Sequence, residues 1–557
     1  MAQDRVGLLE EVTTSSLDDI IANHPDYTPH QVADKILEDI KTTFDLENAI
    51  KGRGKKFGIP DALIPQQVGM IIARMRPVRL IVTTNAGSDS DYALLGVYQE
   101  DGPNQGIYDT SDEAVRNLVR EYNFSLSKNQ IEEAASFLRD NIPRVSPCKE
   151  KNLIAVNNGI FDFDTKKLLP FSDDKVFLSK SKVNYNPNAK NITIHNDADG
   201  TDWDVESWMN SLSDDPEVVN VLWQIIGAII RPNVPWGKSA WFYAESGNNG
   251  KGTLCELMRQ ICGEGTYASI PLSDMGKDFM LEPLTHASAI IVDENDVGTY
   301  IDKAANLKAI ITGDTIQINR KFKTPVPHKF HGFMVQCMNE MPKIKDKSDS
   351  FFRRQLFVPF TKCFTGVERK YIKQDYLKRK EVLEYVLFKV LNMDYEELSV
   401  PKVCEDALNE YKEFNDPVRQ FLSEVLKKAK WSLLPYEFLY DMYKVWFKNN
   451  IPNGTVQGRA AFIKDVKAIV NNDTSLGWSD SQARVATHMI CAEPLIREYE
   501  LFKWGNARYA TSKNDENACV YVLPDNDKDK KFRGLKKLDK QNGLFCDGDT
   551  EENAGEE

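Results

Sequence analysis

A glycine-rich segment between a short apolar run and an amphipathic stretch constrains this chain more than any other feature. Residues 240–244 read Ala-Trp-Phe-Tyr-Ala, which predicts a strand, and residues 254–261 predict a helix. Residues 245–253, between them, read Glu-Ser-Gly-Asn-Asn-Gly-Lys-Gly-Thr. A strand, a glycine-rich loop and a helix N-terminus in this order direct backbone N–H groups at one point, which is what a phosphate needs. The sequence therefore predicts a phosphate-binding loop.

This loop supplies the candidate nucleotide-binding residues, which are Gly247, Asn249, Gly250, Lys251, Gly252 and Thr253. The phosphate-loop pattern G-x-x-x-x-G-K-[ST] is not met in full, because Glu245 replaces the first glycine and Gly252 replaces the hydroxyl that binds Mg²⁺. We expect Lys251 to contact the β- and γ-phosphates and Thr253 to stand in as the magnesium ligand. A glycine-rich turn that binds no ligand is the alternative.

Two later apolar runs end in polar side chains that a magnesium–nucleotide site requires. Residues 289–292 are followed by Asp293 and Glu294, 42 residues after Lys251, and residues 332–338 are followed by Asn339. One carboxylate is needed for the hydrated metal and another for the attacking water, so we assign Asp293 to Mg²⁺ and Glu294 to water. Asn339 is a candidate contact for the γ-phosphate or the water; a strand-end turn is the alternative.

The stretch from Arg320 to Arg354 is basic within an acidic chain. It holds nine Lys or Arg against three Asp or Glu, whereas the whole chain has a net charge of −13. Residues 316–329 predict a hairpin with the basic–aromatic tip Arg320, Lys321, Phe322 and Lys323. Point charges beside an aromatic ring suit a nucleic-acid backbone and its bases. We therefore expect a DNA-binding hairpin, with a merely solvated hairpin as the alternative.

Arg353 and Arg354 follow this stretch as a pair. Arginine stabilises the charge that develops on a transferred phosphoryl group, and a subunit interface is a usual place to supply it. A surface pair would look the same in the sequence.

Composition removes several classes of protein. Hydrophobic residues make up 41% and charged residues 27% of the 557 residues, which fits several globular domains and excludes wholesale disorder. No run of 18 apolar residues exists, so we expect no membrane span, and the first residues lack the pattern of a secretory signal. The nine cysteines form no C-x-x-C pair, so we expect free thiols in the cytoplasm rather than a zinc ribbon.

The rest of the chain predicts flanking domains without a catalytic motif. Residues 1–145 read as a mixed α+β domain, with an N-cap expected at residues 13–16. Residues 146–215 read as a segment that precedes the domain of the phosphate-binding loop. Asp162 and Asp164 lie two apart, as in paired metal-binding carboxylates, but an ordinary strand that ends in a turn is the favoured interpretation.

The C-terminal part predicts three amphipathic helices within residues 417–470, followed by strands near residues 485–490 and 499–504. This is the order of a winged helix, which we place at residues 401–512. Residues 513–557 are rich in Asp and Lys and predict a charged, flexible tail.

Taken in order, the five central elements resemble the superfamily 3 helicases, and more closely the phage and poxvirus primase–helicase branch, whose loop reads G-x-G-x-N-G-K-S-T. Gly247, Asn249, Gly250, Lys251 and Thr253 match this pattern, and Glu245 and Gly252 depart from it. The resemblance implies that Asp293 and Glu294 are the Walker B acids, that Asn339 is the sensor, and that Arg353 or Arg354 is a finger acting on the neighbouring subunit. Residues 308–321 look like the family's DNA hairpin, with Lys321-Phe322 where members often have Lys-His. Residues 157–162, 185–187 and 203 onward look like the segment before the motor.

We therefore expect a multidomain α/β protein with a P-loop AAA+-like ATPase domain at residues 216–400. The expected activity is that of an ATP- and Mg²⁺-dependent replicative DNA helicase of a phage or mobile element, without priming. Expected partners are single-stranded or forked DNA and the chain itself in a hexameric ring, in the host cytoplasm if the source is viral. A polymerase or a single-strand-binding protein is a further candidate partner. The alternatives are an ATP-switched initiator or loader, and a nucleotide kinase-like enzyme.

Overall fold

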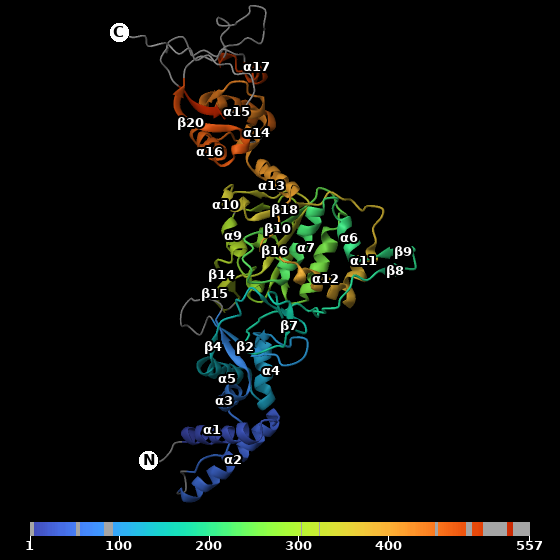
Figure 1. Ribbon diagram of the computed structural model, residues 1–557. Helices are drawn as coiled ribbons and strands as arrows, with labels where there is room; N and C mark the ends of the chain where they lie inside the picture. The colour runs from blue at the N-terminus through green and yellow to red at the C-terminus, as the bar shows by residue number, and fades with distance from the viewer. Residues whose placement is uncertain are drawn as a thin grey trace, which may run out of the picture. The chain divides into compact units, whose positions relative to one another are not determined.

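The structure of the protein is a computed structural model that describes residues 5–51, 56–82, 93–301, 303–321, 323–451, 455–485, 493–504 and 532–538. It divides into two compact units, Met1–Leu408 and Asn409–Glu557, and each is described by itself. Figure 1 shows the elements of both units. None of the helices in the described part of the chain is long and apolar enough to cross a lipid bilayer.

The first unit begins with a helical domain that carries a small sheet. Its sheet has the order β3-β2-β1-β4, with β1 antiparallel to β2 and parallel to β4. Helices and sheet enclose one apolar core, as is typical of a mixed α+β domain. Its elements are α1 (Arg5–Asn23), α2 (Pro29–Ile50), α3 (Pro65–Met75), β1 (Val78–Ile81), β2 (Leu94–Tyr98), β3 (Tyr108–Asp109), α4 (Asp112–Tyr122), α5 (Lys128–Asn141) and β4 (Arg144–Val145).

The N-cap expected at residues 13–16 is wrong, because α1 runs through them. Thr13 and Thr14 donate their hydroxyl hydrogens to the carbonyls of Leu9 and Glu10, one turn back. Hydroxyl side chains inside a helix can form hydrogen bonds to the carbonyls one turn back, so they do not have to mark the start of the helix. At α2, by contrast, the Thr28 hydroxyl caps the helix and accepts from the Gln31 N–H.

A segment of short strands connects this domain to the central sheet. It contains β5 (Leu153–Val156), β6 (Gly159–Asp162), β7 (Lys167–Leu169), β8 (Ile194–Asn196), β9 (Thr201–Trp203) and α6 (Val205–Ser211). Strands β5, β6 and β7 form an antiparallel sheet, and β8 pairs with β9.

The centre of the first unit, here called the sheet domain, is a five-stranded parallel sheet in the order β11-β12-β16-β10-β18. The strands alternate with helices, as the apolar runs predict. Its elements are α7 (Pro216–Ile230), β10 (Ser239–Tyr243), α8 (Lys251–Cys262), β11 (Tyr267–Ala268), β12 (Ala289–Val292), β13 (Tyr300–Ile301), α9 (Ala304–Thr312), β14 (Thr315–Arg320), β15 (Lys323–Lys329), β16 (Phe333–Met338), β17 (Lys343–Ile344), α10 (Asp349–Phe352), β18 (Gln355–Pro359), α11 (Lys370–Gln374) and α12 (Lys380–Asn392).

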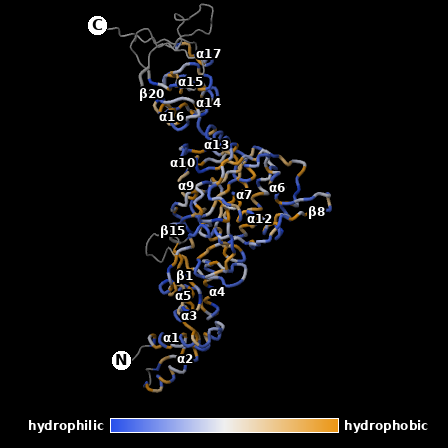
Figure 2. Tube along the Cα trace, viewed as in Figure 1, coloured by the Kyte–Doolittle hydropathy of each residue, from blue (hydrophilic) through white to orange (hydrophobic). Residues whose placement is uncertain are grey.

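Helix α7 supplies much of the apolar face that covers this sheet, and its buried residues join one core with those of α8, β10, β16 and α12. The orange positions of Figure 2 gather along these elements. The buried polar residue of the helix, Gln224, is satisfied by a distant part of the chain, because its side chain bonds both the Ser399 hydroxyl and the Ser399 N–H. A buried polar side chain without such partners would cost free energy.

The second unit contains the three expected helices and a three-stranded antiparallel sheet in the order β19-β21-β20. Its aromatic core includes three fully buried tryptophans, Trp431, Trp446 and Trp478. Helix α13 (Lys402–Asn415) leads into this unit. Its other elements are α14 (Pro417–Lys428), β19 (Leu433–Pro435), α15 (Tyr436–Asn450), α16 (Arg459–Asn472), β20 (Trp478–Val485), α17 (Pro494–Glu498) and β21 (Phe532–Lys537).

Two expectations for this region are wrong. The strand expected at residues 499–504 is instead a turn and a 3₁₀ helix, Phe502–Trp504. The stretch expected to be a flexible tail contains β21, the central strand of the sheet, in which Leu535 is fully buried. A Cβ at Gly534 would lie 2.1 Å from the Leu434 carbonyl oxygen, so this glycine permits the close pairing. Of the strand expected at residues 485–490, Val485 is the last residue of β20, and residues 486–490 lie outside the described residues.

Candidate functional site

The glycine-rich loop lies between β10 and α8 and ends in a tight turn at Gly250. That glycine has φ of +89° and precedes the first residue of α8. A Cβ there would lie 2.6 Å from a methyl carbon of Leu212, so the turn requires glycine for both conformation and space. The Asn249 side chain accepts a hydrogen bond from the Lys251 N–H at 3.3 Å and donates to the Ser246 carbonyl. The loop therefore places the N-terminus of α8 at the carboxyl edge of the sheet.

Lys251 is buried, with 4% of its surface exposed, although a lysine normally keeps its charge in water. Its Nζ donates to Asn339 Oδ1 at 2.9 Å, so the loop and the end of β16 are joined by a hydrogen bond. Burial lowers the pKa of Lys251, while the neighbouring thiols and Glu294 act in the opposite direction. The structure thus brings together Lys251 and Asn339, which the sequence placed in separate motifs.

The two acids follow β12 at the same edge. Arg259 of α8 contacts both carboxylate oxygens of Asp293, with Nη2–Oδ1 at 2.9 Å and Nη1–Oδ2 at 3.2 Å. This guanidinium lowers the pKa of Asp293, burial acts against it, and Lys373 adds a smaller effect in the same direction as Arg259. Glu294 is exposed. Both carboxylates are therefore placed near the phosphate-binding loop.

Asn295, which the sequence reasoning missed, fixes the end of β12. Its amide donates to Gln336 Oε1 and the Cys337 carbonyl, both at 2.9 Å, and its carbonyl accepts from the Leu272 N–H. The side chain is buried and fully engaged, so it holds the acid-bearing turn against β16. An asparagine next to two acids carried no distinguishing signal in the sequence.

Arg353 and Arg354 lie at the opposite edge of the sheet. The Arg354 carbonyl accepts from the N–H of Ser239, the first residue of β10, whereas Lys251 comes after the end of that strand. Five residues of strand span about 16 Å. Neither arginine therefore lies beside the phosphate-binding loop of its own chain.

The two arginines differ in their surroundings. Arg354 Nη1 donates to the Ser350 carbonyl and, at 2.9 Å, to the Ser350 hydroxyl, which ties this side chain to α10. Arg353 is exposed at the end of α10.

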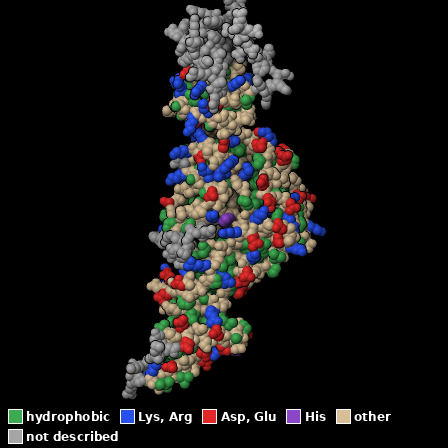
Figure 3. Space-filling view, turned by 60° about the vertical axis from the view of Figure 1, so that its left-hand side comes forward, with side chains coloured by type: hydrophobic (Ala, Val, Ile, Leu, Met, Phe, Trp, Pro, Cys, Tyr) green, Lys and Arg blue, Asp and Glu red, His purple; other side chains and the backbone are tan. Residues whose placement is uncertain are grey.

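The hairpin forms as expected from β14 and β15, with Ile316 opposite His328 and Arg320 opposite Lys323. Lys321 is exposed at the tip. Phe322 and the side chain of Lys323 lie outside the described residues. Figure 3 turns this side of the first unit forward and shows blue Lys and Arg side chains gathered over part of the sheet domain.

A neighbouring loop, which the sequence analysis did not single out, accompanies the hairpin. Asn319 of β14 donates to Asp278 at 2.8 Å, and the next residue, Phe279, has φ of +65° with 53% of its surface exposed. A left-handed conformation at a large exposed residue is uncommon. In the sequence, Phe279 belongs to the short apolar run Phe-Met-Leu, which does not distinguish it from a core residue.

A cavity of about 850 Å³ opens beside the phosphate-binding loop. We call it the α6–α11 cavity, since α6, the loop and α11 line it. Its basic lining residues are Arg369, Lys370 and Lys373, all on or beside α11. Asn248 of the loop donates to Glu368 at 2.9 Å, which fixes this wall to the loop. The sequence analysis missed this wall because residues 364–374 match no motif.

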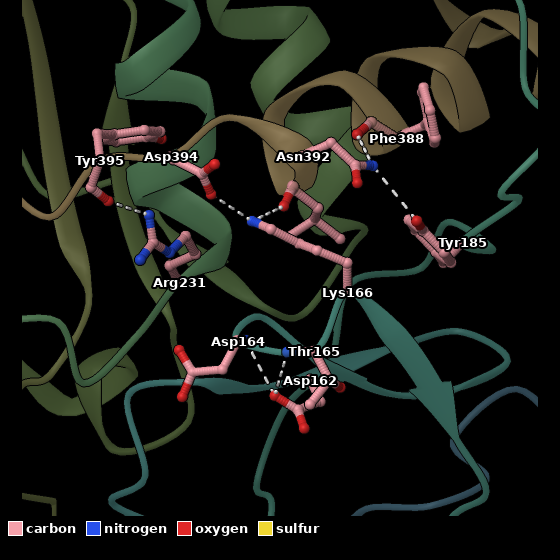
Figure 4. A network of polar contacts seen from close by, with 11 residues as sticks. Asp162, Asp164, Thr165, Lys166, Tyr185, Arg231, Phe388, Asn392, Asp394 and Tyr395 are labelled. Carbon is pink, nitrogen blue, oxygen red and sulfur yellow. Dashed lines mark hydrogen bonds and ion pairs between the residues drawn. The ribbon is translucent and has the colours of Figure 1, made fainter.

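Asp162 and Asp164 do not share a strand face. Asp162 Oδ1 accepts from the N–H groups of Asp164 and Thr165 and closes the turn after β6, as Figure 4 shows. Lys166 then reaches the Leu391 carbonyl and Asp394, both at 3.0 Å. The interpretation as an ordinary strand ending in a turn is confirmed. Within the described residues no group of three or more His, Cys, Asp or Glu could hold a metal ion.

The donor set at the loop still fits Mg²⁺ held on a nucleotide. Magnesium is usually bound by one or two carboxylates together with substrate phosphates and water, rather than by a protein cage. Asp293, Glu294 and Thr253 lie at one edge of the sheet, and Thr253 lines the cavity; Asp293 is paired with Arg259 and would exchange that partner for the metal. The arrangement can therefore bind a phosphorylated ligand and expose it to a carboxylate and an amide.

Three sequence families match successive parts of the chain. Residues 78–212 match the family described as D5 N terminal like, residues 242–354 a family of unknown function (DUF5906), and residues 413–497 the Poxvirus D5 protein-like family.

The protein described as "Putative helicase 022R" of Frog virus 3 (isolate Goorha) is 29% identical over 158 residues. The match covers 25% of this chain and 16% of that relative's length.

Solved structures of the NrS-1 C-terminal region are also similar. One apo form is 14% identical, with a TM-score of 0.39, over 80% of this chain and 96% of that chain. A second is 12% identical, with a TM-score of 0.39, over 83% of this chain and 99% of that one.

Proposed function

Because this chain belongs to the phage and poxvirus branch of the superfamily 3 primase–helicases, we propose that it is an ATP-driven replicative DNA helicase. The observation that carries the proposal is the distribution of side chains over the two edges of one parallel sheet. Lys251, Asp293 and Asn339 gather at the carboxyl edge, and Arg353 lies exposed at the amino edge. Ligands of open α/β sheets bind at the carboxyl edge.

We assign the sheet domain to the P-loop AAA+-like ATPases. The N-terminus of α8 would receive the phosphates of ATP, and Lys251 would exchange its bond to Asn339 for a phosphate oxygen. Glu294, exposed after β12, would take the proton of the attacking water. Thr253 and Asp293 would hold Mg²⁺, which neutralises charge on the phosphates.

The position of Arg353 supports a ring. A finger that cannot reach the nucleotide of its own chain can complete the site of a neighbour, and repetition of this contact closes a ring, which we propose to be a hexamer. The tie between Arg354 and Ser350 favours Arg353 as the finger.

We propose that the hairpins carry the DNA. Lys321 at the tip and Arg320 beside it would track the phosphate backbone, and the exposed Phe279 offers a ring on which a base can stack. The second unit, with three helices and the β19-β21-β20 sheet, has the elements of a winged helix and is a further candidate contact for DNA, a polymerase or a single-strand-binding protein.

The experiment that tests this function measures ATP hydrolysis with and without single-stranded DNA, followed by unwinding of a forked duplex. We expect hydrolysis that DNA stimulates and that Lys251→Ala abolishes. Hydrolysis indifferent to DNA in a monomer would favour a nucleotide kinase-like enzyme. Binding of ATP without hydrolysis would favour an ATP-switched initiator or loader. Priming is not expected, and a primer-synthesis assay on the same DNA checks this.

A further inference from the structure

The glycine at position 252 is not explained by the fold. It lies in the first turn of α8, in helical conformation, where any residue is allowed. Among the described residues, a Cβ at this position would meet only Lys373 Nζ, at 3.8 Å, which is an ordinary contact. Serine or threonine would therefore fit. The hydroxyl that normally follows the loop lysine is missing without a steric reason.

Thr253, the proposed magnesium ligand, offers its hydroxyl from a different position on the helix than a residue at 252 would. Consecutive residues of an α-helix point about 100° apart, so a side chain at residue 253 leaves the helix in another direction than one at residue 252. The space next to Gly252 faces the α6–α11 cavity, which both residues line. A cation lies 3.8 Å from the point where the side chain of residue 252 would begin.

That cation is the ammonium group of Lys373, on α11. Its charge lowers the pKa of Asp293, after the larger effect of Arg259, so its field reaches the acid-bearing end of β12 as well as the start of α8. A bound triphosphate and its metal would lie between the end of β12 and the start of α8.

The fold holds α11 in this place. The Phe364 N–H donates to the Asn248 carbonyl at 2.8 Å, and Asn248 also bonds Glu368, so the chain that enters α11 is tied to the phosphate-binding loop. Tyr371 donates to Asp199 at 2.7 Å and packs against the main core. The base of the Lys373 side chain is therefore positioned, while its ammonium stays exposed in the cavity.

We propose that Lys373 is a second phosphate-binding cation. A hydroxyl at position 252 would bind Mg²⁺ and so bring positive charge to the phosphates, and Lys373 supplies part of that charge instead. An ammonium group binds phosphate oxygens as a point charge and does so without metal. ATP should then bind this protein with an unusually small dependence on Mg²⁺. The inference rests on the proposed ATP site and names an additional residue of that site.

The test is an equilibrium titration of the full chain with a fluorescent ATP analogue, once with Mg²⁺ and once with EDTA. In EDTA, we expect Lys373→Ala to weaken binding by about tenfold or more, the scale of one lost charge-assisted contact. Lys373→Arg should keep most of the affinity. Lys378→Ala is the control. It removes an exposed lysine four residues after Gln374, the last residue that lines the α6–α11 cavity, and should leave binding unchanged.

A second variant separates a phosphate contact from a general effect of charge. Gly252→Ser, which the space permits, should increase the dependence of binding on Mg²⁺. In the double variant Gly252→Ser/Lys373→Ala, Mg²⁺ should restore binding toward the wild-type value, while binding in EDTA stays weak. If Mg²⁺ does not restore binding in the double variant, the inference that Lys373 replaces the function of the missing hydroxyl is overturned.

The outcomes separate this inference from the proposed function. Wild-type affinity of Lys373→Ala in EDTA, beside loss of binding in Lys251→Ala, would overturn the role of Lys373 alone. Absence of ATP binding by the wild-type chain, or wild-type binding by Lys251→Ala, would overturn the proposed ATP site itself.

Discussion

Lys251 Nζ lies 2.9 Å from Asn339 Oδ1, so the lysine of the phosphate-binding loop is held by the amide that ends the neighbouring strand β16. A buried ammonium needs such a partner, because burial otherwise favours its neutral form, as the lowered pKa of Lys251 indicates. In the proposed site a phosphate oxygen takes over this role, which releases Asn339 to face the reacting phosphate.

The two partners should therefore respond differently to substitution. We expect Lys251→Ala to abolish hydrolysis and weaken ATP binding, since the charge on the phosphates is lost. Asn339→Ala should still bind ATP but hydrolyse it about a hundredfold more slowly, as for a lost contact to a developing charge. Steady-state kinetics and nucleotide titrations measure the two effects. An Asn339→Ala enzyme with the wild-type turnover number would contradict the assignment.

The edge-to-edge separation of Lys251 and Arg353 predicts complementation between subunits. Each of Lys251→Ala and Arg353→Ala should lower hydrolysis by about a thousandfold or more. An equimolar mixture of the two variants should regain part of the activity, because some interfaces then combine an intact lysine with an intact arginine. The mixture is assayed after joint incubation with nucleotide. Activity that never exceeds that of the separate variants would argue against a shared site.

Arg354 provides the matched control for this experiment. Its guanidinium binds Ser350 within the same chain, so we expect Arg354→Ala to destabilise the sheet domain by about 1 kcal/mol. Mixing Arg354→Ala with Lys251→Ala should bring no gain beyond the sum of the two. A gain as large as that of the Arg353 mixture would move the finger to Arg354.

The hairpin should couple hydrolysis to DNA. We expect Lys321→Ala to lose stimulation by single-stranded DNA and unwinding of a forked duplex, with ATP binding intact, because it removes the charge proposed to contact the DNA backbone. Lys329→Ala removes an exposed lysine at the other end of the same strand pair and is the control. Unwinding by Lys321→Ala at the wild-type rate would show that the tip does not grip the strand.

His328, at the base of the hairpin, predicts a dependence of stability on pH. Burial, with smaller effects of His331 and His286, lowers its pKa from 6.5 to about 4, so the unfolded chain binds the proton more readily than the folded one. Stability from this residue is complete above pH 6.5 and falls as the pH drops toward 4, by at most roughly 3 kcal/mol. Denaturant unfolding of the wild type and His328→Gln across this range measures the difference. Equal slopes in both proteins would exclude His328 as the cause.

The sheet domain could be predicted because its signals are local. Strands β12 and β16 are short apolar runs followed directly by the polar residues Asp293 and Asn339, and the loop before α8 has glycine where a turn demands it. The parallel sheet brings the ends of these runs to one edge, so Lys251 and Asn339 meet although 88 residues separate them.

The parts that escaped prediction depend on tertiary contacts. Among the described side chains of strand β21, Leu535 is the fully buried one within a charged stretch, and pairing with β19 and β20 makes this stretch a strand. The wall formed by residues 364–374 reads as a polar connection, and its place beside the loop follows from the bonds of Asn248. Thr13 and Ser16 were mistaken for a helix start because their burial inside α1 leaves no trace in the sequence.

The placement of Arg353 and Lys251 on opposite edges of one sheet has a consequence for control. Under the proposed assembly, an isolated chain carries two half-sites and no complete one. It should therefore not hydrolyse ATP until it assembles with other copies. The rate per chain should then rise steeply with protein concentration and level off once rings are filled. Dilution alone would switch the enzyme off, and ATP would be spared wherever too few copies accumulate on DNA.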